Sequence, residues 1–186
     1  MVGGPEYCAA QARIITAATE LFSERGVGGT SLQMIADALG VTKAAVYHQF
    51  KTKEEIVIAV AEAELDKVEA AIGAAESEPN RDRARDVLVT RMVDLGVAGR
   101  HMESALVGDP VIVRFFAGHK RHRQVMGRPY RLLARDEGDP DGRLSAAMLT
   151  AAIGGAVMHP LVAELSDDAL RSQLLRLARR FLGLPA

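Results

Sequence analysis

Residues 30–53 read TSLQMIADALGVTKAAVYHQFKTK, and this stretch predicts two short helices joined by a tight turn. Thr30 or Ser31 can supply the oxygen that caps the first helix, and Gln33 stands three residues after Thr30, which is the spacing of a capping box. Apolar residues then recur at three- and four-residue intervals as far as Gly40, a residue type that commonly ends a helix in the left-handed conformation. The first helix is therefore about two turns long.

The second predicted helix begins at Thr42 and has two unlike faces. Its inward face consists of Ala45, Val46 and Phe50. Its free face carries short, hydrogen-bonding, cationic and aromatic side chains, namely Thr42, Lys43, Ala44, Tyr47 and His48. Side chains of these types suit an element that enters the major groove of duplex DNA. The segment thus has the layout of a helix-turn-helix DNA reader.

A third helix is predicted directly after the second, because Thr52 and Glu55 repeat the capping-box spacing. Lys53 lies in its first turn, where a lysine adds its charge to the exposed amides of a helix N-terminus and suits a phosphate. From Lys43 to Lys53 there are three lysines and no carboxylate, whereas residues 54–78 contain eight acids and one lysine. The positive charge is therefore local, within a chain of formal net charge −1.

Two short amphipathic helices joined by Gly-Val also occur in helical proteins that never bind nucleic acid. The pattern alone therefore leaves a DNA-binding and a structural interpretation open. Residues 13–26, RIITAATELFSERG, add a longer amphipathic helix that ends at Gly26. Three helices can thus close a small core behind the predicted reader.

From Ala9 to Glu64 the order and spacing of these segments resemble the N-terminal domain of TetR-type (TetR/AcrR) transcriptional regulators. The resemblance is carried by RIITAATELFSERG followed by TSLQMIADALGVTKAAVYHQFKTKEE. It implies that residues 42–50 form the recognition helix and that Tyr47 and Lys53 contact the DNA backbone. The resulting set of predicted DNA-binding residues is Thr30, Ser31, Thr42, Lys43, Ala44, Tyr47, His48, Gln49, Lys51 and Lys53.

The resemblance also implies a one-component regulator, most often a repressor, that binds a palindromic operator as a homodimer and is released by a small-molecule effector. Some positions depart from the family pattern. Gln49 stands where the family usually has histidine, with His48 one position earlier, and Ala44 replaces a frequent glycine. Lys51-Thr52 stands in place of a frequent Pro-Ser. His48 and Gln49 both remain candidates for the phosphate contact.

Length and composition favour an all-α protein of two domains. Of the 186 residues, 48% are hydrophobic and only 4% aromatic, and the abundance of alanine and leucine favours packed helices. This length suits one DNA-binding module and one regulatory domain. We expect a flexible N-terminal arm over residues 1–8, a helix-turn-helix domain over residues 9–52, and a helical effector-binding and dimerisation domain over residues 53–186.

Beyond residue 52, the spacing of apolar residues predicts helices over about residues 53–75 and 83–97. The inward residues expected are Ile56, Ala59, Val60, Ala63 and Val68 in the first, and Val87, Leu88, Met92 and Leu95 in the second. Asp109-Pro110 has the cap-then-proline order of a helix start, for a helix through Val113, Phe116 and beyond. Residues 138–142, GDPDG, predict a loop.

Two helices predicted near the C-terminus can either close the domain's own core or pair with a second chain. Residues 144–159 are rich in small side chains that allow another helix to approach closely, and Pro160 kinks or ends this helix. Ser166 caps the last helix. The resemblance implies that both helices form a four-helix dimer interface, for which the candidate residues are Leu149, Ala152, Gly155, Leu170, Leu174, Leu177 and Phe181.

A basic segment between residues 110 and 135 contains seven cations and no acid. The cations are Arg114, Lys120, Arg121, Arg123, Arg128, Arg131 and Arg135, and His119 and His122 lie among them. The favoured interpretation is a solvated face paired with the acidic helix over residues 53–75, since charge runs usually face water. The alternatives are an entrance for an acidic effector, a second nucleic-acid surface, and a metal site at the two histidines.

The resemblance implies a pocket for the effector, and thioether and aromatic side chains are suited to varied apolar ligands. The candidate pocket residues are Met92, Met102, Phe115, Phe116, Met126, Tyr130, Met148 and His159. Core packing explains any one of them equally well.

Catalytic patterns are lacking: no Ser-His-Asp order, phosphate-cradling glycine loop or credible set of metal ligands appears. We therefore expect no enzymatic activity, no cofactor and no metal; the alternative is a helical enzyme or carrier whose N-terminal helices are only structural. The single cysteine, Cys8, cannot form an intrachain disulfide. Neither a membrane-spanning run nor a secretory signal is present in the sequence, so we expect a cytoplasmic protein that does not contact membranes.

Overall fold

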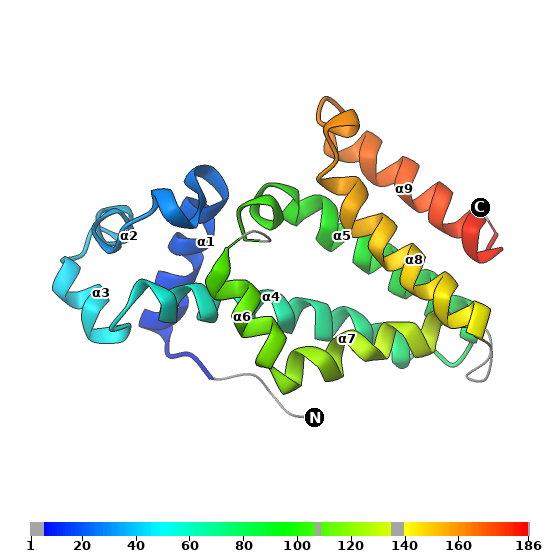
Figure 1. Cartoon of the computed structure of the whole chain (residues 1–186), viewed down its shortest axis with the longest axis horizontal. Helices are drawn as coiled ribbons and strands as arrows, with labels where there is room; N and C mark the ends of the chain where they lie inside the picture. The colour runs from blue at the N-terminus through cyan, green and yellow to red at the C-terminus, as the bar shows by residue number, and fades with distance from the viewer. Residues whose placement is uncertain (1–5, 107–108, 135–139, 186) are drawn as a thin grey trace. The chain divides into compact units, whose positions relative to one another are not determined.

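The computed structural model describes residues 6–106, 109–134 and 140–185, apart from the side chains of residues 101–106 and 140. Over these residues the chain is helical and contains no strand (Figure 1), which confirms the all-α prediction. The elements are α1 (Ala9–Gly29), α2 (Leu32–Leu39), α3 (Lys43–Gln49), α4 (Lys53–Glu76), α5 (Arg81–Leu106), α6 (Pro110–Gly118), α7 (Lys120–Leu133), α8 (Pro140–Val157), the 3₁₀ helix η1 (Pro160–Val162) and α9 (Asp167–Leu182).

The chain forms two compact units, which we call the N-terminal and the C-terminal unit. The N-terminal unit comprises Met1–Asp66 and His101–His119, and the C-terminal unit comprises Lys67–Arg100 and Lys120–Ala186. The predicted boundary between residues 52 and 53 coincides with the start of α4, whereas the N-terminal unit continues along α4 to Asp66 and also includes α6.

The core of the N-terminal unit receives a buried apolar side chain from each of its helices. Phe22 of α1, Ile35 of α2, Val46 of α3 and Ile56 of α4 are fully buried, and Ile112 of α6 is 3% exposed. Burial of a side chain of this size contributes about 1.5–3 kcal/mol. The packing of these five residues therefore holds the short helices α2 and α3 against the longer α1 and α4.

Two glycines of this unit have a positive φ, one at a break within α1 and one at the end of α2. Gly26 has φ 71°, which breaks the regular backbone of α1 at the residue where the sequence predicts its end. Gly40 has φ 65° and ψ 31°, the left-handed conformation expected after α2, and its N–H donates to carbonyl oxygens of the last turn of α2. The tight turn between α2 and α3 therefore depends on a conformation that residues with a Cβ rarely adopt.

The C-terminal unit is built around α5, and its buried face is shifted from the predicted one. Val87, Met92 and Leu95 are only half-buried and, of the predicted set, Leu88 alone is fully buried. The fully or nearly fully buried apolar residues are instead Ala84, Leu88, Val89, Val93 and Val97. The reason is that the row 85, 89, 93 and 97, at four-residue spacing, faces inward over this part of the helix.

Three further boundaries refine the predictions for this half of the chain. The Asp109 carboxylate caps α6 by accepting from Val111 N at 2.8 Å, as Asp109-Pro110 predicts, but α6 ends at Gly118 and α7 is a separate helix. Pro140–Gly142, predicted as loop, form the first turn of α8, while the rest of GDPDG lies outside the described residues. Ser166 caps α9 as predicted, accepting from Ala169 N at 3.3 Å.

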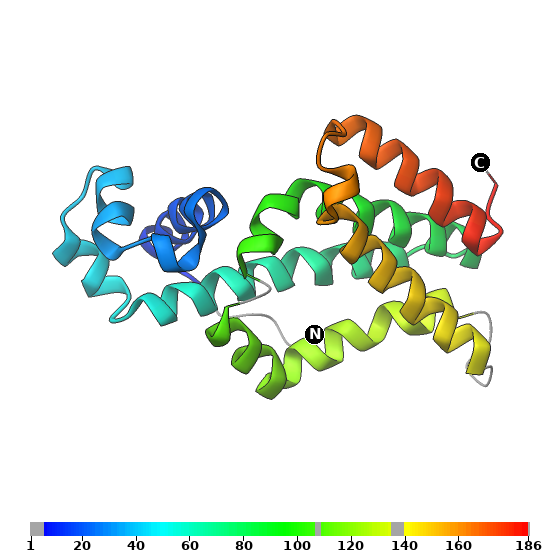
Figure 2. The same ribbon diagram turned by 45° about the horizontal axis from the view of Figure 1, so that its top comes forward.

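Helices α8 and α9 lie side by side, as Figures 1 and 2 both show. Helix α8 ends at Val157, and Pro160 begins η1. Ion pairs join α9 to α5: Arg171 Nε lies 2.6 Å from Asp94 Oδ1, and Arg179 Nε lies 2.6 Å from Asp86 Oδ1. Helix α9 is thus fixed to the unit on one side while its other side remains open.

Gly40→Ala is expected to lower the free energy of unfolding by about 1 kcal/mol, because alanine is strained at positive φ. Gly28→Ala is the matched control. Gly28 lies in a helical stretch, and a Cβ added there meets no atom within 4 Å. This control should leave stability unchanged or slightly raised. Urea unfolding at fixed protein concentration measures both changes, and equal stability of the two variants would contradict the role of the turn.

Candidate nucleic-acid interface

The pair α2–α3 forms a helix-turn-helix whose two N-termini are capped by side chains. Ser31 Oγ accepts from Met34 N at 3.2 Å, and Thr42 Oγ1 accepts from Ala45 N at 3.2 Å. The turn between the helices is closed by Val41 N, which donates to Ala36 O at 3.0 Å. Each cap satisfies an amide at a helix start. The two caps therefore fix where each short helix starts, and the turn fixes the direction of α3 relative to α2.

The exposed side of α3 is the side that the sequence predicts. Lys43, Ala44, Tyr47 and His48 are exposed, with Tyr47 52% exposed, whereas Val46 is fully buried. Ala45, predicted to face inward, is exposed, because the inward row of this seven-residue helix consists only of Val46 and, directly after the helix, Phe50. One face of α3 is thus available to a partner along its whole length.

Thr30 does not belong to this surface. Its side chain is buried, and its hydroxyl lies 3.0 Å from Gly26 O and 3.2 Å from Leu21 O, between which it shares its single proton. Ser31 alone caps α2, and Gln33, expected to complete a capping box, instead donates to Asp37 Oδ1 at 2.7 Å. The prediction of a side-chain contact from Thr30 to DNA is therefore wrong: the hydroxyl joins α2 to the end of α1.

Lys51 lies at the C-terminal end of α3. Its Nζ donates to Tyr47 O at 3.2 Å and to His48 O at 3.4 Å, and lies 5.3 Å from the centre of the Tyr47 ring. A cation is favourable at a helix C-terminus, where unpaired carbonyls concentrate negative charge. Lys51 thus caps the C-terminal end of α3, and its own ammonium group lies over the Tyr47 ring.

Lys53 joins α4 to the helices before it. Its Nζ donates to Val27 O at 2.8 Å and to Thr30 O at 3.1 Å. An ammonium has three N–H donors, so these two bonds leave one donor and the full charge at the N-terminus of α4. Two hydrogen bonds complete this corner. In the first, Thr52 Oγ1 accepts from Glu55 N at 3.1 Å, as predicted. The Glu55 carboxylate accepts from Lys51 N at 2.7 Å, one residue earlier than a capping box requires.

His48 and Gln49, the two residues that depart from the family pattern, have unlike surroundings. Gln49 is half-buried, and its Oε1 lies 3.7 Å from Cys8 Sγ. His48 is exposed, and its Nδ1 lies 3.4 Å from Gln49 Nε2. Of the two, His48 is the side chain that faces outward.

The predicted pocket residues are spread over different parts of the chain. Phe115 and Phe116 pack against the core of the N-terminal unit, and Phe115 stacks on His119 with ring centres 4.4 Å apart. Met92, Met126 and Tyr130 are half-buried in the C-terminal unit. The side chain of Met102 lies outside the described residues. The structure thus divides this set between the two units.

Two of the predicted pocket residues are on the surface. Met148 is 56% exposed and lines a groove between α8 and α9. His159 is exposed, and its Nδ1 accepts from Leu161 N at 3.2 Å, which caps η1. Both residues therefore border solvent, Met148 in the groove and His159 at the start of η1, and their contact with an effector stays a prediction.

Two cations of α7 pair with acids of α4, as the favoured interpretation predicts, but Arg121 is buried rather than solvated. Arg121 Nη2 lies 2.7 Å from Glu69 Oε2, and Arg128 Nη1 lies 3.0 Å from Glu69 Oε1. Arg128 Nε also donates to Glu76 Oε1 at 3.0 Å, and this hydrogen bond is the main reason why the pKa of Glu76 is lowered. Among the described residues, no group of three or more His, Cys, Asp and Glu side chains could hold a metal.

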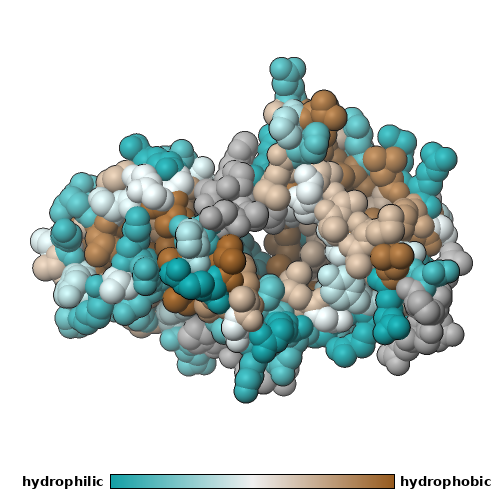
Figure 3. All heavy atoms as spheres, viewed as in Figure 1, coloured by the Kyte–Doolittle hydropathy of each residue, from teal (hydrophilic) through white to brown (hydrophobic). Residues whose placement is uncertain are grey.

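The groove between α8 and α9 is apolar and open to solvent. Its lining residues are Met148, Leu149, Ala152, Ile153, Ala156, Leu174, Leu177, Ala178 and Phe181. Figure 3 shows apolar side chains gathered over these two helices. Leu170, predicted to belong to an interface, is 2% exposed and so packs inside the unit, whereas Leu177 and Phe181 are about half exposed at 52% and 50%. Helix α9 thus has an internal and an external apolar row.

The family model for bacterial regulatory proteins of the tetR family matches residues 14–60, which span most of α1, the helix-turn-helix and the start of α4. The chain matches the tetR family over these N-terminal helices. It is 39% identical over 72 residues to the probable HTH-type transcriptional regulator ArpR of Pseudomonas putida, covering 39% of this chain and 34% of that protein. Identity to the regulator AcrR of Shigella flexneri is 49% over 43 residues, or 23% of this chain and 20% of that one.

A solved structure is similar over nearly the whole chain. A TetR/AcrR-family transcriptional regulator from Thermobifida fusca is 27% identical, with a TM-score of 0.68, over 90% of this chain and 95% of that one. The sequence matches to the curated relatives, in contrast, span about a third of their length or less. The tetR-family likeness thus extends to both units in fold, whereas in sequence it is concentrated in the N-terminal helices. None of the described helices could span a membrane.

Thr30→Val is expected to lower the free energy of unfolding by about 1 kcal/mol, because it removes a buried hydroxyl that bonds two main-chain carbonyls. Thr16→Val is the control, since Thr16 Oγ1 donates to Ala12 O at 3.1 Å from an exposed position of α1. Its effect should stay within about 0.5 kcal/mol. Urea unfolding of both variants measures the difference. A Thr30→Val protein as stable as wild type would contradict the structural role of the Thr30 hydroxyl.

Proposed function

We propose that this tetR-family protein is a one-component transcriptional repressor. It binds a palindromic operator as a homodimer and is released from it by a small-molecule effector. The observation that carries the proposal is the exposed face of α3, which presents Lys43, Ala44, Tyr47 and His48 from a capped helix-turn-helix. A helix presented in this way fits the major groove, where side chains of these types meet base edges and phosphates.

The contacts that we propose follow from where each side chain lies. The residues at the N-terminal end of α3 face the base edges, namely Lys43 and Ala44. The residues that cap α2 and α3, those on the C-terminal half of α3 and those at the corner with α4 face the phosphates, namely Ser31, Thr42, Tyr47, His48, Lys51 and Lys53. Gln49 turns toward Cys8, so we assign to His48 the contact that the family usually makes with histidine. Thr30 is not part of the proposed surface.

A second copy of the chain is the proposed occupant of the groove between α8 and α9. The groove is lined by apolar side chains, and the small residues Ala152 and Gly155 beside it are exposed, so a partner helix can approach closely. Exposed apolar patches rimmed by polar residues mark association surfaces. Pairing also serves DNA recognition, because two recognition helices must reach successive major grooves about 34–36 Å apart or a multiple of one turn.

The proposed effector acts by its differential affinity for two states of the dimer, one of which fits the operator. Met92, Met126 and Tyr130 remain candidates for its contacts, because they are half-buried in the C-terminal unit and have adaptable or amphipathic side chains. The effector class is open. A ligand screen scored by operator release addresses it directly.

Tyr47→Ala and Lys53→Ala are each expected to weaken operator binding while the protein remains folded. For Lys53 the loss of one phosphate neutralisation should also reduce the slope of log affinity against log salt by about 0.9. Fluorescence anisotropy with an operator duplex, defined by footprinting the DNA beside the gene, measures affinity and slope between low and moderate salt.

Arg83→Ala is the control for the salt dependence. Arg83 is exposed at the start of α5 in the C-terminal unit and pairs with Glu78 at 3.1 Å, so its removal changes the net charge by the same amount as Lys53→Ala. This control should keep the wild-type slope. If Tyr47→Ala and Lys53→Ala both bind as wild type does, the proposed DNA surface is wrong.

Phe181→Glu and Leu174→Glu are expected to dissociate the dimer, because each places a carboxylate in the apolar groove. Sedimentation equilibrium measures the change, and operator affinity should fall by at least about tenfold as the monomer loses one half-site. Leu161→Glu is the control, since Leu161 is 88% exposed and does not line the groove. Variants that remain dimeric would show that α8 and α9 do not form the interface.

A further inference from the structure

A cavity of about 330 Å³ lies at one end of the C-terminal unit, where α5 and α8 begin and α7 and α9 end. Each of these four helices contributes to its lining, for example Arg85 from α5, Leu133 from α7, Ser145 from α8 and Leu182 from α9. None of the residues considered above for the effector lines it. Its volume lies within the range of small-molecule sites, about 300–1,000 Å³.

Arg85 is the buried cation of this cavity, with a side chain only 7% exposed. Its Nη1 lies 3.3 Å from Asp82 Oδ1, and its Nη2 donates to Leu182 O at 3.2 Å. A guanidinium carries five N–H donors, so these two bonds leave donors unused. Its Nε has no hydrogen-bond partner among the described residues. Because a buried donor without an acceptor is costly, Arg85 is suited to a further acceptor within the cavity.

The start of α8 adds to the positive character of the cavity. Asp141 and Gly142 lie in the first turn of this 18-residue helix and line the cavity. The N–H groups of a first helical turn have no partner within the helix, and their partial positive charge favours an anion. The carboxylates of Asp82 and Asp141 are exposed, so solvent screens their charges. The buried side-chain charge at this cavity is therefore the positive charge of Arg85.

The remaining wall of the cavity is largely apolar. Leu133, Ala146 and Leu182 are buried, and the half-exposed Phe181 lies beside them. Ser145, half-buried on α8, adds a hydroxyl. A bare anion such as phosphate would meet the guanidinium but would leave this apolar wall without a partner. The combination thus favours a ligand with one anionic group and an apolar body.

We propose that this cavity binds a small organic acid. Its carboxylate accepts hydrogen bonds from the Arg85 guanidinium, and its apolar body packs against Leu133, Ala146 and Phe181. Hydrogen bonds between a guanidinium and a carboxylate are strengthened by both charges and favoured by their matching planar shapes. The inference goes beyond the proposed function, because such binding requires neither DNA nor a second chain. Phe181 also lines the groove between α8 and α9, so the bound acid contacts a residue that the cavity and the groove share.

Benzoate is the probe for this site, and isothermal titration calorimetry of the full chain at constant ionic strength measures its binding. Wild-type protein should bind benzoate with a dissociation constant of about 1 mM or lower. Benzamide has nearly the same shape without the charge, and inorganic phosphate has the charge without the apolar body. Each should bind at least about tenfold more weakly than benzoate, because each lacks one of the two kinds of contact.

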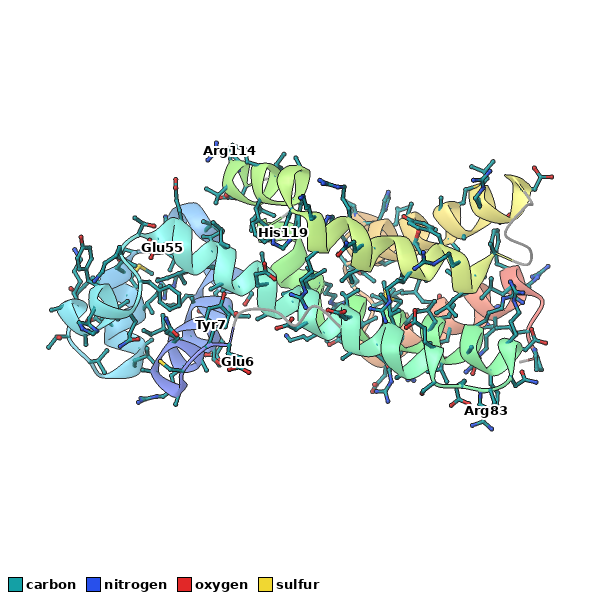
Figure 4. The ribbon with its side chains drawn as sticks, turned by 90° about the horizontal axis from the view of Figure 1, so that it is seen from below. Glu6, Tyr7, Glu55, Arg83, Arg114 and His119 are labelled. Carbon is teal, nitrogen blue, oxygen red and sulfur yellow. The ribbon has the colours of Figure 1, made fainter. Side chains whose placement is uncertain are left out.

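Two variants test the location of the bound acid. Arg85→Gln removes the guanidinium, and Ser145→Leu fills the cavity while leaving Arg85 in place. Each should weaken benzoate binding at least about tenfold. The matched controls are Arg83→Gln and Ser172→Leu, because both residues are exposed and neither lines the cavity. Figure 4 shows Arg83 pointing outward at the start of α5. Both controls should bind benzoate as the wild type does.

The inference is overturned if wild-type protein does not bind benzoate, or if benzamide or phosphate binds as tightly. It is also overturned if a folded Arg85→Gln or Ser145→Leu protein keeps the wild-type affinity, since benzoate would then lie elsewhere. Circular dichroism establishes that each variant is folded. If Arg85→Gln is unfolded because Leu182 O loses its donor, the comparison of Ser145→Leu with Ser172→Leu decides.

Discussion

The burial of Val46 in the core of the N-terminal unit is the contact on which the DNA-reading surface depends. Helix α3 has only seven residues, and a helix of this length is unstable in water by itself. It persists because Val46 is fully buried and Phe50 is 5% exposed, so that one apolar row anchors the helix. The remaining positions face solvent. The same short row thus makes the helix stable and leaves its other face free for a partner.

A helix as short as α3 also needs residues that satisfy the main-chain groups at its two ends. Thr42 caps the start and Lys51 the end, and Gly40 supplies the left-handed residue that turns the chain between α2 and α3. Each of these features involves residues within four positions of one another. Local features of this kind are visible in a sequence, and for this reason the turn and the Thr42 cap could be predicted, whereas the Lys51 contacts at the end of α3 were not.

Side chains that bond to distant parts of the chain could not be placed in the same way. Thr30 is adjacent to the cap of α2 and matches the capping-box spacing, yet its hydroxyl bonds to α1 as far back as Leu21, nine residues earlier. Lys53 bonds to Val27, which is 26 residues away. The buried face of α5 likewise depends on which neighbouring helices cover it. Periodicity shows that a helix is amphipathic, but a shift of one residue changes which side chains are buried.

The charges on α4 illustrate how a nearly neutral protein can present a basic surface. Glu69 and Glu76 of α4 pair with Arg121 and Arg128 in the C-terminal unit, and Glu62 of α4 bonds to His119 in the N-terminal unit. These pairs neutralise the acidic face within a few ångströms. Neutralised pairs contribute little potential beyond their own surroundings, because salt screens interactions beyond about 10 Å. The lysines near α3 therefore determine the local potential.

Those lysines also differ in how much conformational freedom their side chains lose on binding. Lys51 and Lys53 already hold fixed hydrogen bonds to main-chain carbonyls, so their side chains are partly ordered before DNA arrives. Ordering a long side chain at an interface costs about 0.5–1.5 kcal/mol, and a preordered lysine avoids much of that cost. Lys43, exposed at the start of α3, must be ordered by the DNA itself. On the proposed surface, Lys51 and Lys53 therefore favour a fixed register on the phosphates, whereas Lys43 can adjust to different base edges.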